Sequence, residues 1–229
     1  MSQLVDTAEM YLKAVFELEE EGVVPLRARL VERLEQSKPT VSETVARLER
    51  DGLMHVGNSR AIALTDKGRR QATRVMRKHR LAERLLLDVL GMPWHEIHEE
   101  ACRWEHVMSD AVEARMERML AETSVDPFGN PIPGEDAVGP EGNTAADAGL
   151  RSIKEWLGGG ESGLCKLVRI AETLQTSPEG LQRLKNHGIV PGAVLEVESD
   201  AGEVRVAAVG EEAGAIVLDD VEATHLFVR

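Results

Sequence analysis

Apolar side chains recur every three or four positions over the first fifty residues, and this period predicts three helices. The predicted helices span residues 4–21, 26–35 and 39–51. Pro39 suits the first turn of the third helix, and Gly52 ends it. Two short β-prone runs follow, at 53–56 and 61–64, around a Gly-Asn-Ser-Arg turn that favours a hairpin. Three helices and a hairpin predict a winged helix-turn-helix domain over residues 1–73.

The helical period resumes from 66 to about 90, stops at the Gly-Met-Pro run 91–93, and returns from 95 to 122. The last segment is expected to be one long helix with an apolar stripe. The stripe consists of Trp104, Met108, Ala111 and Val112. Beside a DNA-binding module, such a stripe is typical of a dimer interface or of support for the domain core. Residues 74–140 are therefore predicted to form a helical dimerisation domain.

Proline and glycine become frequent from 123 to about 160, which predicts a linker. The part 141–160 is expected to be flexible. The run 126–134, Asp-Pro-Phe-Gly-Asn-Pro-Ile-Pro-Gly, is stiffer and suited to docking on a surface.

Past Gly163 the period changes from helical to alternating, which indicates β-strands. The predicted strands span 166–170, 193–197, 203–207 and 215–218. Between the first two strands, Ser177 and Pro178 begin one short helix. This pattern predicts a small β-barrel over 161–229, so the whole chain is expected to be mainly α with a small β-barrel.

The chain has 229 residues, 42% of them hydrophobic, which is enough for two or three small domains with their own cores. No apolar run approaches the roughly 18 residues that span a bilayer, and the N-terminus lacks a signal-peptide pattern. The two cysteines, Cys102 and Cys165, form neither a zinc ribbon nor a disulfide framework. We therefore expect a cytoplasmic protein without a membrane partner.

The formal net charge of −13, from 27 Lys+Arg and 40 Asp+Glu, argues by itself against a nucleic-acid binder. Its distribution reverses that argument. Residues 27–80 hold 14 Lys+Arg and 6 Asp+Glu, a local charge of +8, whereas the other 175 residues hold 13 and 34, a local charge of −21. A basic block inside an acidic chain indicates one surface for a polyanion, although a solvated helical surface would give the same count.

The third predicted helix carries a polar stripe on the side away from its apolar positions, which suits the major groove of DNA. The stripe consists of Thr40, Glu43, Arg47 and Arg50. The candidate phosphate contacts are Arg27, Ser42, Arg47, Arg50 and Arg60. The alternative is the generic polar face of a small helical domain. Glu43 can only accept hydrogen bonds, so it either reads cytosine N4 or adenine N6, or pairs with Arg47 at i+4.

Cys102, Glu105 and His106 lie at i, i+3 and i+4 of the long predicted helix, within an arc of about 100°. A thiol, a carboxylate and an imidazole that point the same way suit a divalent transition metal. Met10, nearly opposite the apolar face of the first helix, could add a thioether from the DNA-binding domain. Two alternatives stay open: a cysteine hydrolase that uses Cys102 and His106, and a Met10 that only fills a groove between helices.

A second candidate metal set combines His79 and Glu83, spaced i, i+4, with His98 after the proline break. Two imidazoles and a carboxylate suit Fe, Zn, Mn or Co. From the spacing alone, ordinary surface polar residues are an equally good explanation.

Six runs of the chain share one resemblance. They are Leu-Val-Asp-Thr at 4–7, Glu-Met-Tyr-Leu at 9–12, Pro-Leu-Arg-Ala-Arg at 25–29, Met-Arg-Lys-His-Arg-Leu-Ala-Glu-Arg at 76–84, Ala-Cys-Arg-Trp-Glu-His-Val-Met-Ser at 101–109 and Pro-Phe-Gly-Asn-Pro-Ile-Pro-Gly at 127–134. These runs closely resemble the family of the diphtheria toxin repressor and the actinobacterial iron-dependent regulators. The likeness spans nearly the whole chain and is most specific in the Cys-Arg-Trp-Glu-His block. It implies a homodimeric transcriptional repressor, activated by Fe(II), with an SH3-like C-terminal domain.

The resemblance also implies roles for individual residues. The residues that match the primary, activating metal site are Met10, Cys102, Glu105 and His106. Those that match the ancillary metal site are His79, Glu83 and His98, with Glu172 and Gln175 from the C-terminal domain. The DNA contacts that it implies are Thr7, Ser37, Pro39 and Thr40. Two positions depart from the family: Glu43 stands where relatives carry glutamine, and Lys38 replaces an expected glycine, so operator choice is the property most open to change.

The resemblance further implies two Fe²⁺ per chain, with Co²⁺, Ni²⁺, Mn²⁺ or Zn²⁺ able to substitute in vitro. The implied partner is double-stranded DNA, an AT-rich inverted repeat bound by one or two homodimers. The predicted function is therefore Fe(II)-activated, sequence-specific repression of iron homeostasis genes. The alternatives are a manganese-responsive regulator of the same family, a metal- or thiol-dependent hydrolase, and a metal-storage protein.

Overall fold

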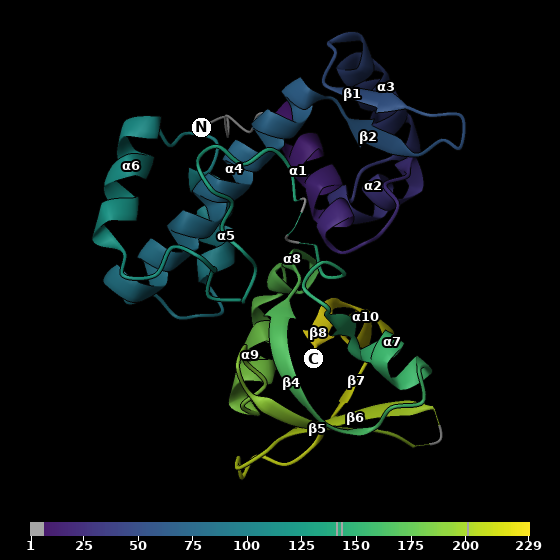
Figure 1. Cartoon of the computed structure of the whole chain (residues 1–229), viewed down its shortest axis with the longest axis vertical. Coiled ribbons are helices and arrows are strands. Elements are labelled where there is room, and N and C mark those ends of the chain that lie inside the picture. Colours follow the sequence, from purple (N-terminus) through teal and green to yellow (C-terminus); the bar gives the residue numbers. More distant parts are fainter. Residues whose placement is uncertain (1–6, 141, 143, 201) are drawn as a thin grey trace.

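The computed structural model describes residues 7–140, 142, 144–200 and 202–229, which form three parts (Figure 1). The first part contains α1 (Thr7–Glu20), α2 (Arg27–Leu34), α3 (Lys38–Arg50), β1 (Met54–Val56) and β2 (Ile62–Leu64). The two strands are antiparallel, with Met54 opposite Leu64. The three helices and the hairpin predicted from the sequence are confirmed, although residues 4–6 of the first predicted helix lie outside the described residues.

Local sequence explains where α3 begins. The Ser37 side chain accepts a hydrogen bond from the backbone N–H of Thr40, and Pro39 occupies the first turn. Glu35, with a φ of 51°, ends α2 and makes the turn between the two helices tight. The core of this part is apolar and buried: Tyr11, Leu12, Val15, Phe16, Leu30, Val41, Val45, Leu48, Met54 and Ile62.

The second part contains α4 (Asp66–Arg84), the π-helical turn η1 (Leu85–Val89), α5 (Ile97–Trp104) and α6 (Asp110–Met119). The prediction of one helix over 95–122 is wrong. The Ser109 side chain accepts from the backbone N–H of Val112 and caps a new helix, so local capping outweighs the apolar period. The expected stripe is interrupted as a result: Trp104 and Met108 are half-buried, whereas Ala111 and Val112 are exposed.

The proline-rich run 126–134 is docked, as predicted. Phe128 is fully buried, with its ring 4.8 Å from the ring of Trp94. The buried Asp126 carboxylate accepts the backbone N–H groups of Phe128 at 2.7 Å and Asn130 at 2.9 Å. The Asn130 amide in turn donates to the carbonyl of Ile170 at 3.1 Å, which ties the run to the third part.

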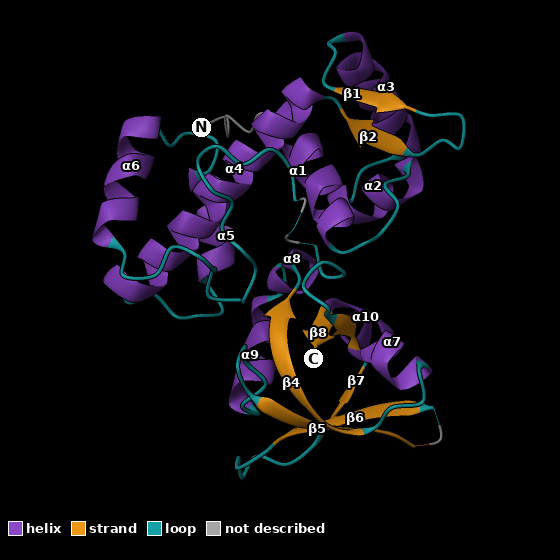
Figure 2. Cartoon of the chain, in the orientation of Figure 1, coloured by secondary structure: helices purple, strands orange, loops and turns teal. Residues whose placement is uncertain are grey.

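The third part is an antiparallel sheet with short helices (Figure 2). Its strands are β3 (Arg151–Ser152), β4 (Gly163–Ile170), β5 (Val194–Asp200), β6 (Glu203–Ala208), β7 (Ile216–Leu218) and β8 (Leu226–Val228). Its helices are α7 (Ile153–Gly158), α8 (Glu172–Gln175), α9 (Pro178–Asn186) and α10 (Asp220–His225). The strand order is β3-β8-β4-β5-β6-β7, and no ladder in the described residues joins β3 to β7. The sheet therefore stays open and does not close into the predicted small β-barrel, because the two-residue strand β3 and the short β7 form its edges.

The structure also differs from the predicted linker over residues 151–158, which form β3 and α7. Ser152 and Glu155 make a reciprocal capping box, and Ile153 and Trp156 are buried in the core of the sheet. A capping motif of four residues is a weak signal within a glycine-rich sequence, so the composition predicted a linker instead.

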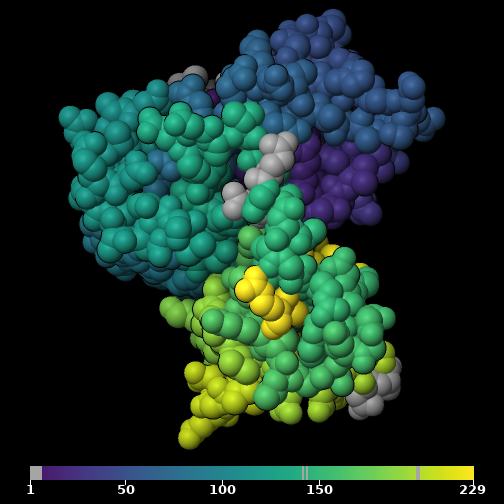
Figure 3. Space-filling model, viewed as in Figure 1, coloured from purple at the N-terminus to yellow at the C-terminus, as the bar shows by residue number. Residues whose placement is uncertain are grey.

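The three parts meet around α1, α4 and α8 (Figure 1). The space-filling view shows the sheet as a separate lobe, with the segment after residue 134 lying across its junction with the helical parts (Figure 3). Two hydrogen bonds hold that segment: the N–H of Gly139 donates to the Thr73 hydroxyl at 2.8 Å, and the N–H of Ala145 donates to the carbonyl of Glu20 at 2.9 Å.

Candidate metal centre and DNA-binding surface

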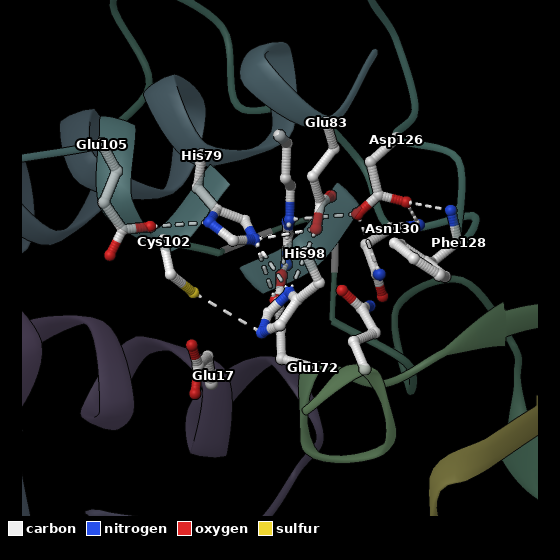
Figure 4. Close-up of polar contacts among 12 residues, drawn as sticks. Glu17, His79, Glu83, His98, Cys102, Glu105, Asp126, Phe128, Asn130 and Glu172 are labelled. Atoms are coloured by element: carbon white, nitrogen blue, oxygen red, sulfur yellow. Dashed lines mark hydrogen bonds and ion pairs between the residues drawn. The ribbon is translucent and has the colours of Figure 1, made fainter. Parts of the chain in front are cut away.

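Four buried side chains converge at the junction of the three parts. His79 and Glu83 lie one turn apart on α4, His98 lies on α5 and Glu172 begins α8. One ligand atom from each lies within 4.8 Å of the others (Figure 4). Nε2 of His79 is 2.9 Å from Oε1 of Glu83 and 3.3 Å from Oε2 of Glu172, and Nδ1 of His98 is 3.1 Å from Oε1 of Glu83. The structure thus brings together four of the five residues expected at the ancillary site.

The spacing of these atoms fits a metal ion. Donor atoms that share a transition metal at about 2.1 Å lie roughly 3.0–3.4 Å apart, and here the contacts run from 2.9 to 3.5 Å. Within this cluster Oε2 of Glu83 is buried without a hydrogen-bond partner, and Oε2 of Glu172 lies 3.3 and 3.5 Å from the two imidazoles. Because unpaired buried oxygens are rare, the Glu83 oxygen supports a cation at this point.

Gln175 ends α8, three residues after Glu172. Its Nε2 donates to the carbonyl of Ile170 at 2.9 Å, which fixes the amide and leaves Oε1 as its free acceptor. The side chain is 1% exposed. An amide oxygen held this way can serve as a ligand.

Neighbouring charges shift the pKa values of the side chains in this cluster. Burial alone would lower the pKa of His98, but the Cys102 thiolate outweighs it and raises the pKa to about 10. Burial and Lys13 lower the pKa of His79, yet Glu83 and Glu172 raise it well above its usual value. Burial would raise the pKa values of Glu83 and Glu172, but His79 lowers both. The carboxylates are therefore ionised, as metal ligation requires, whereas the two imidazoles are protonated without a metal and would release their protons when one bound.

Glu105 and His106 do not lie on a long helix with Cys102; they follow the end of α5. The two carboxylate oxygens of Glu105 face different partners. Oε2 is 2.6 Å from Nδ1 of His79, and Oε1 is 3.2 Å from Nε2 of His106. Nδ1 of His106 is 2.7 Å from a carboxylate oxygen of Glu9 on α1.

The Cys102 thiol faces the histidines of the other set rather than converging with Glu105 and His106. Its Sγ is 3.6 Å from Nε2 of His98 and groups with His79 and His98. The two expected metal sites are thus neighbours that meet at His79, whose Nδ1 faces Glu105 while its Nε2 faces Glu83 (Figure 4). The spacing in the sequence did not predict this junction.

A cavity of about 640 Å³ opens beside Cys102 between α1, α2, α5 and α8. Met10, Cys102, Glu105 and His106 all line it. Met10 therefore faces the same space as the three residues with which the resemblance groups it, and it lies outside the apolar core of the first part.

The electrostatics of Cys102 allow two kinds of chemistry. Burial alone would raise the pKa of its thiol, but Lys13, His98 and His79 outweigh burial and lower the pKa to about 5. A thiolate beside an imidazole is a soft metal ligand and is also the arrangement of a cysteine nucleophile. The geometry alone leaves both readings open.

Lys13 is a central residue that the sequence analysis missed. Its side chain is 9% exposed, and its ammonium lies 2.8 Å from Oε2 of Glu105. Burial alone would lower the pKa of Lys13, but Cys102 and Glu105 outweigh burial and raise the pKa. Met10, Lys13 and Glu17 all line the cavity, and their spacing of i, i+3 and i+7 on one helix was the signal available in the sequence.

Arg80 was also missed, although it is the largest fully buried side chain. Its guanidinium donates to Glu20 on α1 at 2.5 and 3.0 Å, to Glu172 on α8 at 3.2 Å and to the carbonyl of Pro131 at 2.6 Å. One buried cation thus joins the helix-turn-helix part, the proline-rich run and the sheet. An arginine within a run of basic residues gives no signal of burial.

The residues expected to contact DNA are accessible. The exposed ones are Thr7, Ser37, Pro39, Thr40, Ser42, Glu43, Arg47, Arg50 and Arg60, and Arg27 is half-buried at the start of α2. Arg60 lies at the tip of the β1–β2 hairpin, with a φ of 65°. No ion pair joins Glu43 to Arg47 in the part of the chain that the structure describes, and the Glu43 side chain is exposed.

The basic block 27–80 is not one continuous surface. Six of its cations point towards acidic side chains of other segments. The pairs are Arg33 with Glu17 and Glu21, Arg69 with Glu19, Arg74 and Lys78 with Asp110, Arg77 with Glu113 and Glu117, and Arg80 with Glu20 and Glu172. The exposed positive charge therefore concentrates around α3 and the hairpin.

No described helix has the length and apolar character needed to cross a membrane. Two family models match the chain. The N-terminal DNA binding domain of iron dependent repressors matches residues 3–62, and their metal binding and dimerisation domain matches residues 65–134.

Known proteins of this kind are similar over most of the chain. The iron-dependent repressor IdeR of Mycobacterium tuberculosis is 55% identical over 205 residues, 88% of each chain. The diphtheria toxin repressor of Corynebacterium efficiens is 52% identical over 204 residues, 89% of this chain and 88% of its own. Among solved structures, a manganese-dependent transcriptional repressor complex with manganese has a TM-score of 0.80 at 31% identity and covers 97% of this chain and 99% of its own.

These matches decide against the hydrolase reading of Cys102, because both family models describe repressor domains. The two family models cover α3 and every expected metal ligand up to His106. The chain therefore belongs to the iron-dependent repressor family of DNA-binding transcriptional regulators.

Proposed function

We propose that this protein represses iron homeostasis genes by binding their operators when Fe(II) is present. One observation carries the proposal: a buried cluster of two imidazoles and two carboxylates lies where the DNA-binding part meets the other two parts. A cation at that point would lie next to α1, and α1 shares a hydrophobic core with the recognition helix α3.

Two Fe²⁺ ions per chain would use all the residues that are expected to ligate a metal. The ancillary ion takes His79, Glu83, His98, Glu172 and Gln175. The primary ion takes Met10, Cys102, Glu105 and His106. Each ion supplies a divalent positive charge that neutralises carboxylates contributed by separate segments. Since Met10 lies on α1 and Cys102 on α5, ligation by both residues would hold the DNA-binding part against the second part.

The residues of α3 and the hairpin contact the operator. Ser37, Pro39 and Thr40 at the start of α3 meet bases and phosphates in the major groove, with Thr7 nearby on α1, and Glu43 accepts a hydrogen bond from a base. The phosphate contacts are Arg27, Ser42, Arg47, Arg50 and Arg60. Because Glu43 replaces the glutamine of relatives, the preferred base at its position differs from theirs.

The protein acts as a homodimer on an AT-rich inverted repeat, with one or two dimers per operator. Exposed apolar side chains on the second part support a dimer interface: Val89, Leu90, Val107, Val112 and Met119. Two recognition helices of a dimer must lie one DNA turn apart, roughly 34 Å. The C-terminal part, an SH3-like module, contributes Glu172 and Gln175 from its helix α8, and the protein works in the cytoplasm, where the operator is.

Iron is favoured over manganese by the ligands themselves. Sulfur from Met10 and Cys102 is softer than the oxygen ligands that Mn²⁺ prefers. Co²⁺, Ni²⁺, Mn²⁺ and Zn²⁺ can still occupy the sites in vitro, because affinity follows the general order of divalent metals. A manganese-responsive regulator is the second candidate, supported by the manganese repressor with a similar fold.

A gel-shift experiment with an AT-rich inverted-repeat operator tests the proposal, with Fe(II), Mn(II) and chelator lanes under anaerobic conditions. Fe(II) should retard the operator at lower concentration than Mn(II), and the chelator should abolish retardation. Glu172→Gln should require more Fe(II), whereas Glu179→Gln, an exposed change of the same kind on α9, should behave as wild type. Absence of retardation in every lane would refute the repressor proposal, and a lower requirement for Mn(II) would establish the manganese regulator.

A further inference from the structure

A single ammonium group contacts residues of both expected metal sets. Nζ of Lys13 lies 2.8 Å from Oε2 of Glu105, 3.2 Å from Nδ1 of His79 and 3.8 Å from Sγ of Cys102. Lys13 lies on α1, one turn after Met10, and its side chain reaches into the junction of the parts. The cation therefore occupies the position from which an ion would contact Glu105 and Cys102.

Buried negative charge explains why a cation is needed there. Glu105 is 4% exposed and Cys102 is half-buried, and buried charges are stable only when they are paired. Lys13 and His79 are the cations closest to Glu105 among the described residues. Without a metal, Lys13 thus supplies the positive charge that the ligand set requires.

A metal ion and this ammonium cannot share the same ligands. Both are cations, and an ion bound by Glu105 and Cys102 would lie a few ångströms from Nζ, where like charges repel strongly. The flexible four-carbon stem of lysine can move aside into the adjoining cavity of about 640 Å³. Glu17, four residues further along α1, lines that cavity and offers the displaced ammonium a new partner at i, i+4.

We propose that Lys13 is a built-in competitor of the metal, and that its displacement from Glu105 and Cys102 sets the metal affinity of the protein. This inference rests on the proposed function, because it assumes that a metal ion binds at Glu105. It also gives the metal a direct mechanical effect on the DNA-binding part, since the residue that must move belongs to α1.

Calorimetric titration of the metal-free full-length protein with Co(II), an air-stable probe, tests the inference. Lys13→Met should lower the Kd for Co(II) at least tenfold, because the competitor is gone and Glu105 keeps only imidazole partners among the described residues in the metal-free state. Lys13→Arg retains the positive charge and should bind Co(II) within about threefold of wild type. Lys185→Met, which removes an exposed lysine from α9, is the matched control and should not change the Kd.

Unfolding by urea in chelator provides a second readout. Lys13→Met should unfold at lower urea than wild type without metal, and Co(II) should raise its midpoint by more than it raises that of wild type. If Lys13→Met does not fold without metal, Lys13→Gln replaces it, because glutamine keeps a donor for Glu105 without the charge.

The outcomes separate this inference from the proposed function. Wild-type protein that binds no Co(II) would contradict the metal-dependent function itself. Wild-type binding together with an equal or higher Kd for Lys13→Met would overturn only the role of Lys13. A Lys13→Arg variant that binds as tightly as Lys13→Met would also overturn it, because the charge would then have no effect.

Discussion

Replacing Arg80 by methionine should severely destabilise the metal-free protein. Methionine fills much of the same volume but removes the cation between Glu20 and Glu172, whose carboxylates are almost completely buried. Removing one partner of a buried ion pair leaves an uncompensated charge and costs about 3–5 kcal/mol. Whole domains are stable by only about 5–15 kcal/mol, so this loss is a large share of the total.

Urea unfolding in the presence of chelator, followed by circular dichroism, measures this loss. Arg70→Met changes an exposed arginine on the same helix and should alter the unfolding free energy by no more than about 0.5 kcal/mol. Adding Glu20→Gln to Arg80→Met should recover part of the loss, because one of the unpaired carboxylates becomes neutral. A loss below about 1 kcal/mol for Arg80→Met, or no recovery in the double variant, would refute the view that Arg80 balances these charges.

Three further changes test separate parts of the molecule. Met10→Leu keeps the apolar volume but removes the sulfur, so operator binding in gel shifts should need at least tenfold more Fe(II). The stability of the metal-free protein should stay nearly unchanged. An unchanged Fe(II) requirement would mean that Met10 only packs against its neighbours. Burial alone would raise the pKa of Glu105, but Lys13 and His79 lower it to about 2. The ionised Glu105 carboxylate therefore stabilises the folded protein fully above pH 4.5, and this stabilisation is lost as pH falls through about 2. From pH 5 to pH 2 the metal-free wild type should therefore lose about 3 kcal/mol more unfolding free energy in urea than Glu105→Gln, and parallel losses would contradict this. Arg60→Ala should weaken binding to operator and unrelated DNA alike and reduce the slope of log K against log salt by about 1, whereas an effect confined to the operator would assign Arg60 to base readout.

The elements of the first part could be predicted almost residue by residue. Ser37 and Pro39 mark the start of α3, and the apolar positions of α1 and α3 recur at helical spacing and pack into one core. These signals act within one or two helical turns, so the linear sequence contains all of them. The same holds for most strands of the third part, where alternation is clear.

Local signals failed where two of them competed. The apolar period of 95–122 indicated one helix, but Ser109 caps a new one, so Glu105 and His106 lie in a turn. The capping box of Ser152 and Glu155 was likewise overlooked within a glycine-rich segment. In both places a short polar motif outweighed the broader composition.

The sequence by itself determined which residues carry the chemistry: the thiol, imidazoles and carboxylates of the proposed metal sites and the polar face of α3. Only the tertiary structure decided how they are charged and connected. It placed Lys13 against Glu105, 92 positions away, and Arg80 against Glu172, also 92 positions away. The reason is that a buried charge must find its partner within a few ångströms, and in this fold those partners come from separate helices that meet only after the chain has folded.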